Sequence, residues 1–124
     1  MKAEGRRVAA DLASLIAELR QFVAERDWHQ FHDPKNLAML VASEAGELLA
    51  EYRWVPNTDA DAHSARAEAR ARVVAEIGDV GLGLVMLCDR IGVDLLTAMS
   101  DKLAANRRKY PAEAARGKAE RPEE

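Results

Sequence analysis

Apolar residues recur at intervals of three and four along four segments of the chain, and no segment keeps the alternation that is typical of a strand. The spacing predicts helices over residues 8–26, 34–54, 65–91 and 95–110. The expected fold class is therefore all-α, a four-helix bundle. The core-facing stripe of the first helix is expected to contain Leu12, Leu15, Ile16, Leu19, Phe22 and Val23.

Capping and breaking residues support these helix boundaries. Asp33 can cap free backbone N–H groups ahead of Pro34, which loses no hydrogen bond in a first turn. Gly92 is expected to end the third helix, Asp94 to cap the fourth, and Pro111 to end the fourth. The polar stretch "VPNTDADAHS" after the second helix is expected to be a connection.

Length and composition favour one domain. The chain has 124 residues, of which 48% are hydrophobic and 31% are charged, and this suits a single core. We expect the domain to occupy residues 1–111. Residues 112–124, "AEAARGKAERPEE", carry charges but no large apolar side chain, which predicts a disordered tail.

Charge and cysteine content limit the partners and the compartment. A net charge of −3 gives no sign of a nucleic-acid polymer as partner. Cys88 is the single cysteine and cannot form an internal disulfide, which favours a reducing cytoplasm. Its apolar run "VGLGLVMLC" is too short to span a membrane, and the N-terminal residues lack the apolar stretch of a signal peptide. We therefore expect a cytoplasmic protein without a membrane partner.

Two pairs of acidic residues fall on helix faces that should turn inward. Glu44 and Glu47 are three residues apart, as are Glu76 and Asp79, so the members of each pair project from one side of their helix. Burying neighbouring carboxylates is costly unless a positive charge lies between them. An alternative is that the four acids are solvated surface residues that share this spacing by coincidence.

A divalent cation is the better candidate for that charge. The arginines at positions 66, 70 and 72 are expected to lie off the inward stripe of the third helix. Ligands that are all oxygen suit hard ions, above all Mg²⁺, with Mn²⁺ as a substitute, and Mg²⁺ commonly completes its shell with water and substrate phosphate. The pattern indicates nucleotide chemistry.

Over Leu12 to Pro111 the chain resembles the MazG-like superfamily of all-α nucleoside triphosphate pyrophosphohydrolases, in particular its dCTP pyrophosphatase branch. The acidic pairs "EAGE" and "EIGD" match the family signature of E-x-x-E followed by E-x-x-D. The stretches "FVAERDWHQFHDPKNL", "YRW" and "KLAANRRKYP" resemble the branch pattern in order and spacing.

The resemblance implies that Glu44, Glu47, Glu76 and Asp79 hold Mg²⁺ while water attacks the α-phosphorus of a nucleoside triphosphate. The products are then a nucleoside monophosphate and pyrophosphate. Glu47 is the candidate catalytic residue that orients or deprotonates the water. The implied substrate is dCTP or a modified pyrimidine deoxynucleotide, and the implied role is cleaning of the nucleotide pool.

Six further residues are candidates for substrate binding. Lys102 and Asn106 lie one helical turn apart and are expected to contact the triphosphate and the sugar, with Tyr110 joining them or merely packing. The aromatic and imidazole candidates are Trp28, Trp54 and His32. The tryptophans can stack on a base or pack in the core, His32 can cap a helix or face solvent, and the lysine and asparagine can be ordinary surface residues.

Two positions depart from the branch pattern. Leu19 stands where dCTP-specific relatives carry a histidine, and Gly83 stands where they carry a tyrosine. Both differences remove sugar or base contacts, which predicts a roomier or less selective pocket.

Small size and long amphipathic helices favour a homo-oligomer, with a tetramer preferred to a dimer by resemblance. Three rival classes remain. A di-iron carboxylate bundle would add Glu-x-x-His motifs, which neither acidic pair contains. A helical interaction module would have apolar inward faces, and a nucleotide-binding sensor would keep the ligands with little turnover.

Overall fold

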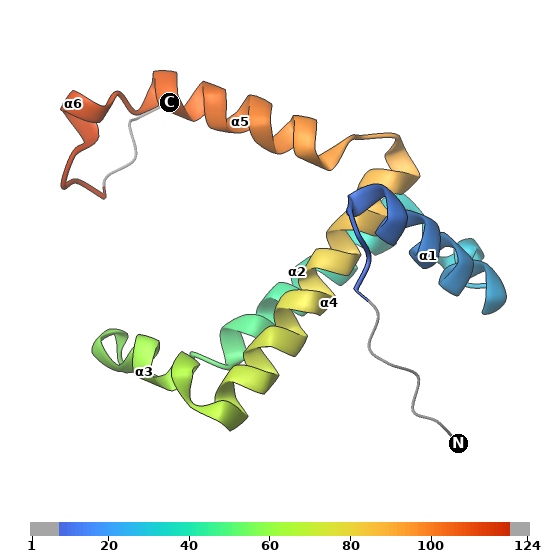
Figure 1. Cartoon of the computed structure of the whole chain (residues 1–124), viewed down its shortest axis with the longest axis horizontal. Helices are drawn as coiled ribbons and strands as arrows, with labels where there is room; N and C mark the ends of the chain where they lie inside the picture. Colours follow the sequence, from blue (N-terminus) through green and yellow to red (C-terminus); the bar gives the residue numbers. More distant parts are fainter. Residues whose placement is uncertain (1–7, 120–124) are drawn as a thin grey trace. The chain divides into compact units, whose positions relative to one another are not determined.

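The computed structural model describes residues 8–119, and every regular element in that range is helical (Figure 1). The elements are α1 (Leu12–Glu25), η1 (His29–Phe31), α2 (Pro34–Ala50), η2 (Asn57–Asp59), α3 (Ala60–Ala65), α4 (Ala67–Ile91), α5 (Leu95–Lys109) and α6 (Ala112–Ala115), where η marks a 3-10 helix. The all-α prediction is confirmed. The predicted tail lies partly outside the described residues, and α6 occupies the first four residues of the tail.

The described chain divides into two units, one ending at Ile91 and one beginning at Gly92. Gly92 has a φ of +73°, a left-handed conformation that glycine adopts at little cost, and it ends α4 as predicted. The first unit holds α1 to α4 and the second holds α5 and α6. The four-helix bundle and the 1–111 domain boundary stay predictions.

Local capping explains where the first two long helices begin. Asp33 caps α2 as predicted, because its carboxylate accepts a hydrogen bond from the Asn36 amide at 2.9 Å. The predicted start of the first helix at residue 8 is wrong. Asp11 accepts a hydrogen bond from the Ser14 amide at 2.8 Å, and this cap starts α1 at Leu12.

The segment between the two acidic pairs is more helical than the sequence analysis predicted. α2 ends at Ala50 rather than at residue 54, because the chain tightens into turns in which the Tyr52 amide donates to the Leu49 carbonyl at 3.0 Å. The expected connection contains η2 and α3. Arg66, with extended backbone at ψ 134°, separates α3 from α4, so the third long helix begins at Ala67.

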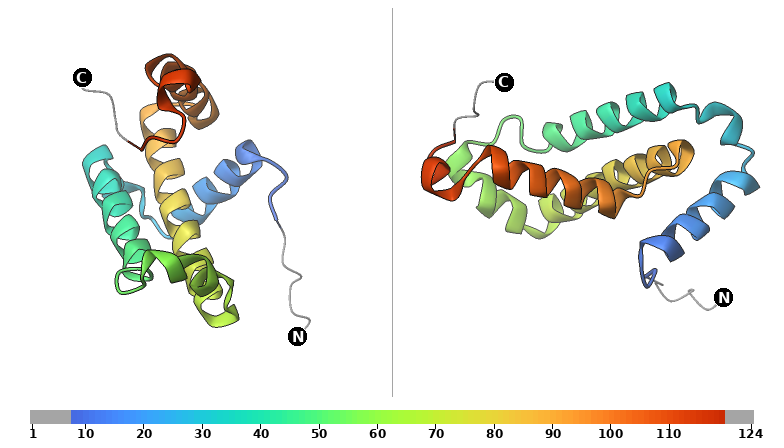
Figure 2. Two further views of the ribbon diagram at one scale, coloured as in Figure 1. Left: turned by 90° about the vertical axis from the view of Figure 1, so that its left-hand side faces the viewer. Right: turned by 90° about the horizontal axis from the view of Figure 1, so that it is seen from above.

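The helices α2 and α4 lie side by side, as the views in Figures 1 and 2 agree. Buried side chains from these helices and α1 form the small core: Val23, Leu37, Ala69, Val73, Val85 and Cys88. Cys88, the single cysteine, is buried in this core. Phe22 was expected to face the core, but it is 43% exposed, and Ile77 on α4 is 54% exposed.

A close approach of the two long helices occurs at Gly83. A Cβ atom added there would lie 3.3 Å from Cγ2 of Val41 on α2, tighter than an ordinary van der Waals contact. The absence of a side chain at Gly83 therefore lets α4 pack closely on α2. Among the described residues, no helix combines the length and the apolar character that crossing a membrane requires.

Candidate metal centre

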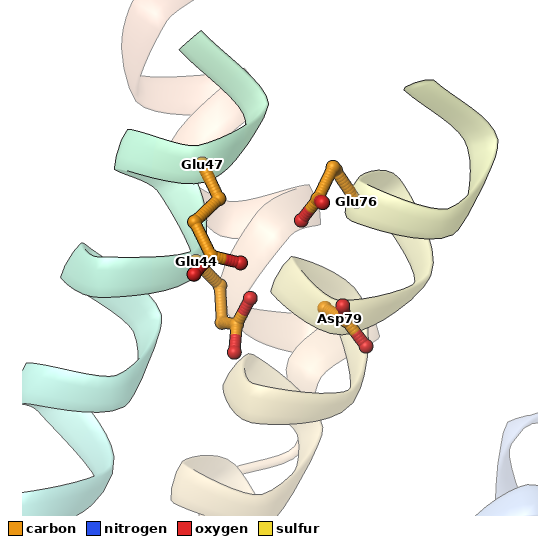
Figure 3. Close-up of side chains that lie close together, drawn as sticks. All are labelled: Glu44, Glu47, Glu76 and Asp79. Atoms are coloured by element: carbon orange, nitrogen blue, oxygen red, sulfur yellow. The ribbon is translucent and has the colours of Figure 1, made fainter. Parts of the chain in front are cut away.

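The two acidic pairs meet across the α2–α4 pair. Glu44 and Glu47 project from α2, and Glu76 and Asp79 project from α4 toward them (Figure 3). One carboxylate oxygen from each residue lies within 4.8 Å of the others. The spacing of three residues produces this convergence, because it places both members of each pair on the same side of their helix. We call these four residues the acidic cluster.

Burial and repulsion make two of these carboxylates unusual. One oxygen of Glu44 and one of Glu76 are fully buried and have no hydrogen-bond partner among the described residues. Burial raises the pKa of both carboxyl groups above the usual range, and neighbouring carboxylates, foremost Glu47, raise them further. Glu47 and Asp79 are exposed. The cluster is therefore partly desolvated and open on one side.

This environment fits a divalent cation. Buried oxygens without partners are costly, and a hard cation satisfies them while it removes the repulsion between neighbouring carboxylates. The donor set contains only carboxylates, which suits Mg²⁺ or Mn²⁺ and provides no histidine or thiolate for softer metals. The cluster is our candidate metal centre.

Arg72 corrects one statement of the sequence analysis. It lies four residues before Glu76, and its Nε donates to Oε2 of Glu51, the residue directly after α2, at 3.0 Å. Arg72 therefore faces α2 beside the acidic cluster rather than lying off that stripe. The spacing of four residues between Arg72 and Glu76 was the signal that could have located it.

A cavity of about 510 Å³ lies between α1, η1, α2 and α4 within the first unit. Its lining residues are Ile16, Leu19, Arg20, Val23, Ala24, His29, His32, Leu37, Met86, Asp89 and Arg90. Leu19 thus borders the cavity, as the predicted pocket requires, whereas Gly83 does not and instead packs against α2. The volume is within the range of small-molecule sites.

The cavity continues the helix faces that carry the acidic cluster. Leu37 precedes Glu44 by seven residues on α2, and Met86 follows Asp79 by seven on α4. Seven residues are nearly two helical turns, so these residues share a face with the acids and lie about 10 Å further along each helix.

Polar groups at the cavity include several that the sequence analysis missed. Arg20 makes a bidentate ion pair with Asp89, in which its Nε lies 3.0 Å from Oδ2, and this pair lowers the pKa of Asp89. Arg90 contacts His29, with Nη1 lying 3.1 Å from Nε2 of the ring. These pairs join residues more than sixty positions apart, so local sequence patterns contained no signal for them.

The predicted aromatic residues occupy exposed positions. Trp28 is 43% exposed and packs edge to face against Phe22, and Trp54 is 88% exposed. The alternative that both tryptophans pack in the core is therefore wrong. His32 is half-buried and lines the cavity.

Lys102, Asn106 and Tyr110 belong to the second unit. Lys102 is exposed, and the other two are half-buried. Lys102 and Asn106 lie one helical turn apart on α5, and the Tyr110 amide donates to the Asn106 carbonyl at 2.8 Å just after the helix ends. Their predicted contacts with substrate stay predictions.

Comparison with known proteins identifies relatives of this chain. Bovine dCTP pyrophosphatase 1 is 39% identical over 109 residues, which cover 88% of this chain and 63% of the bovine protein. Human dCTP pyrophosphatase 1 is 41% identical over 106 residues, covering 86% and 61%. The chain thus spans about three fifths of the length of these relatives. No family model matches the chain.

The fold can also be compared with a solved structure that this chain matches over almost its whole length. The crystal structure of a pyrophosphatase from Archaeoglobus fulgidus DSM 4304 superposes with a TM-score of 0.73 at 32% identity. The match covers 89% of this chain and 99% of the archaeal chain. This chain therefore shares its all-helical fold with a pyrophosphatase. The chain belongs to the MazG-like all-α pyrophosphatase family, and its curated relatives are dCTP pyrophosphatases.

Proposed function

We propose that the protein is a Mg²⁺-dependent nucleoside triphosphate diphosphatase that converts a deoxynucleoside triphosphate to the monophosphate and pyrophosphate. The proposed preferred substrate is dCTP or a modified pyrimidine deoxynucleotide. The observation that carries this proposal is the convergence of four carboxylates, two with unpartnered buried oxygens, between α2 and α4. Membership of the pyrophosphatase family and the dCTP pyrophosphatase relatives support it.

In this proposal Glu44, Glu47, Glu76 and Asp79 hold Mg²⁺, with Mn²⁺ as a substitute. The bound cation supplies charge neutralisation for the triphosphate and makes a nearby water easier to deprotonate. Glu47 is exposed at the open side of the cluster, and its proposed role is to orient the attacking water or to accept its proton. The water oxygen bonds to the α-phosphorus, the bond to the bridging oxygen breaks, and pyrophosphate leaves.

The cavity provides space for the nucleoside. It lies about 10 Å from the acids along the helix faces that carry them, so a nucleotide whose α-phosphate lies beside the metal site can extend its base toward the cavity. His32 lines the cavity, and the exposed side chains of Trp28 and Trp54 are proposed to stack on the base. Lys102, Asn106 and Tyr110 are proposed to contact the triphosphate and sugar.

The exposed apolar surface of the long helices favours self-association. Several large apolar side chains of α2 and α4 remain exposed, among them Met39 at 59%, Leu49 at 61% and Val74 at 51%. We propose that these surfaces are covered in a homo-oligomer, and we favour a tetramer over a dimer. The proposed place of action is the cytoplasm, where removal of unwanted nucleotides protects the precursor pool.

A panel of nucleotides tests the function. The protein is incubated with Mg²⁺ and each common deoxynucleoside or ribonucleoside triphosphate, and with methylated and oxidised pyrimidine deoxynucleotides, and the products are separated. The proposal predicts pyrophosphate release that Glu47→Gln and Glu76→Gln each reduce at least about 100-fold. Binding of nucleotide by the folded wild-type protein without product would instead support a sensor.

A further inference from the structure

An ion pair bounds the acidic cluster at one end. Glu51 follows Glu47 by four residues at the end of α2, and Arg72 precedes Glu76 by four residues on α4. Each member of the pair therefore lies one helical turn from a candidate metal ligand. The pair connects the two helices directly, with 3.0 Å between Nε of Arg72 and Oε2 of Glu51.

The opposite end of the cluster is bounded by a different contact. Gly83 follows Asp79 by four residues and lies against Val41, which precedes Glu44 by three. The four mutually repelling carboxylates thus sit between a close backbone approach on one side and an ion pair on the other. Repulsion within the cluster opposes the close spacing of α2 and α4, so both boundaries have to resist it.

We propose that Glu51 and Arg72 form a positioning pair that holds α2 and α4 at the separation at which the acidic cluster binds a divalent cation. This proposal rests on the metal site of the proposed function. Neither residue is assigned as a metal ligand or as a contact of the nucleotide.

The burial of the pair favours this role over that of an ordinary surface salt bridge. The Glu51 side chain is only 19% exposed, whereas that of Arg72 is 54% exposed. A largely buried carboxylate with a charge-assisted hydrogen bond is held in a defined orientation, unlike two mobile exposed side chains. Glu51 also competes with Glu76, the other acidic neighbour of Arg72 at helical spacing, so that the Glu76 oxygens stay available to the metal.

The pair can be tested by measuring Mn²⁺ affinity without nucleotide, using electron paramagnetic resonance of free Mn²⁺. Glu51→Gln leaves Arg72 to pair with Glu76, and Arg72→Gln leaves Glu51 beside the cluster without its cation. We expect each variant to weaken Mn²⁺ binding about 10-fold, the magnitude typical of residues that orient metal ligands. The double variant should lose no more than either single variant, because the two residues act as one unit.

The reversed pair Glu51→Arg with Arg72→Glu is the decisive variant. It rebuilds the link with opposite polarity, so Mn²⁺ affinity should return to within about twofold of wild type. Glu68→Gln and Arg70→Gln remove the same charges from exposed positions at the start of α4 and should leave the affinity unchanged. Helix content from circular dichroism verifies that every variant is folded.

Two results would overturn the positioning role while leaving the metal site intact. One is an affinity that none of the pair variants changes. The other is an effect of charge alone, in which Glu51→Gln weakens and Arg72→Gln strengthens Mn²⁺ binding and the reversed pair brings no recovery. Wild-type protein that binds no Mn²⁺ would overturn both this inference and the proposed metal site.

Discussion

Glu44 on α2 and Glu76 on α4 lie on opposite sides of one acidic cluster, and each buries a carboxylate oxygen that has no hydrogen-bond partner among the described residues. The cluster therefore combines two costs, desolvation and repulsion, between α2 and α4. A cation that binds there relieves both costs, which links metal binding to stability.

The stability of the metal-free protein should depend on pH. Because the folded pKa values of Glu44 and Glu76 are raised above 4.5, these groups contribute stability that is present below 4.5 and is lost as the pH rises through the raised values. In a chelating buffer, Tm should fall as the pH rises above 4.5. The double variant Glu44→Gln with Glu76→Gln should show a weaker fall.

Mg²⁺ should reverse that trend, since it competes with protons for the same oxygens. The increase in Tm that Mg²⁺ causes should grow with pH in the wild-type protein and be small in the double variant. Thermal unfolding followed by circular dichroism checks both parts. An equal Mg²⁺ effect at low and neutral pH would disagree with ionised carboxylates as ligands.

The ion pair between Arg20 and Asp89 should contribute modestly. Asp89→Asn is expected to reduce the free energy of unfolding by less than about 1 kcal/mol, because the Arg20 side chain is 66% exposed and solvent screens the attraction. The pKa of Asp89 is lowered, so its contribution is present above 3.8 and is lost as the pH falls through the lowered value. Urea unfolding at pH about 7 and about 3 measures the difference.

Gly83 and Gly81 form a matched pair for testing the close helix approach. An added Cβ at Gly81 meets nothing within 4 Å, so Gly81→Ala should stabilise α4 by about 0.5–1 kcal/mol. Gly83→Ala should gain less or destabilise, because the new methyl meets Val41. Adding Val41→Ala should recover part of the difference in urea unfolding. Equal effects at the two glycines would show that the approach is not tight.

Substitution of Trp54 tests whether its exposed ring binds the substrate. If the indole stacks on the base, Trp54→Ala should raise KM for the nucleotide about 5- to 100-fold, and Trp54→Phe should retain part of the affinity. The exposed position makes a folding defect a poor explanation, since 88% of the residue is accessible. An unchanged KM in both variants would remove Trp54 from the proposed site.

The sequence predicted those parts of the structure that depend on local periodicity. The all-helical class, the cap at Asp33, the stop at Gly92 and the convergence of the two acidic pairs follow from spacing and from single capping residues. Helix boundaries that depend on competing local hydrogen bonds were predicted less accurately. The Asp11 cap shortens α1, and the turns after Ala50 end α2 early.

Features that depend on tertiary packing could not be predicted from local sequence patterns. Whether Ile77 faces inward is decided by the position of α2 rather than by the sequence of α4, and it lies 54% exposed. The partners Arg20 and Asp89 are 69 residues apart, so no local pattern pairs them. The loss of a tyrosine at Gly83 was expected to leave a roomier pocket, but Val41 packs against that position.

Phosphorus NMR of a single reaction in heavy-oxygen water tests the central claim most directly. Wild-type protein is incubated with Mg²⁺ and dCTP, or with the best substrate of the panel, and the products and the position of the heavy oxygen are read together. Attack at the α-phosphorus predicts a labelled monophosphate and unlabelled pyrophosphate, with neither product when Glu76 is replaced by glutamine. A nucleoside diphosphate with labelled inorganic phosphate, or unlabelled monophosphate with label in pyrophosphate, would contradict the account.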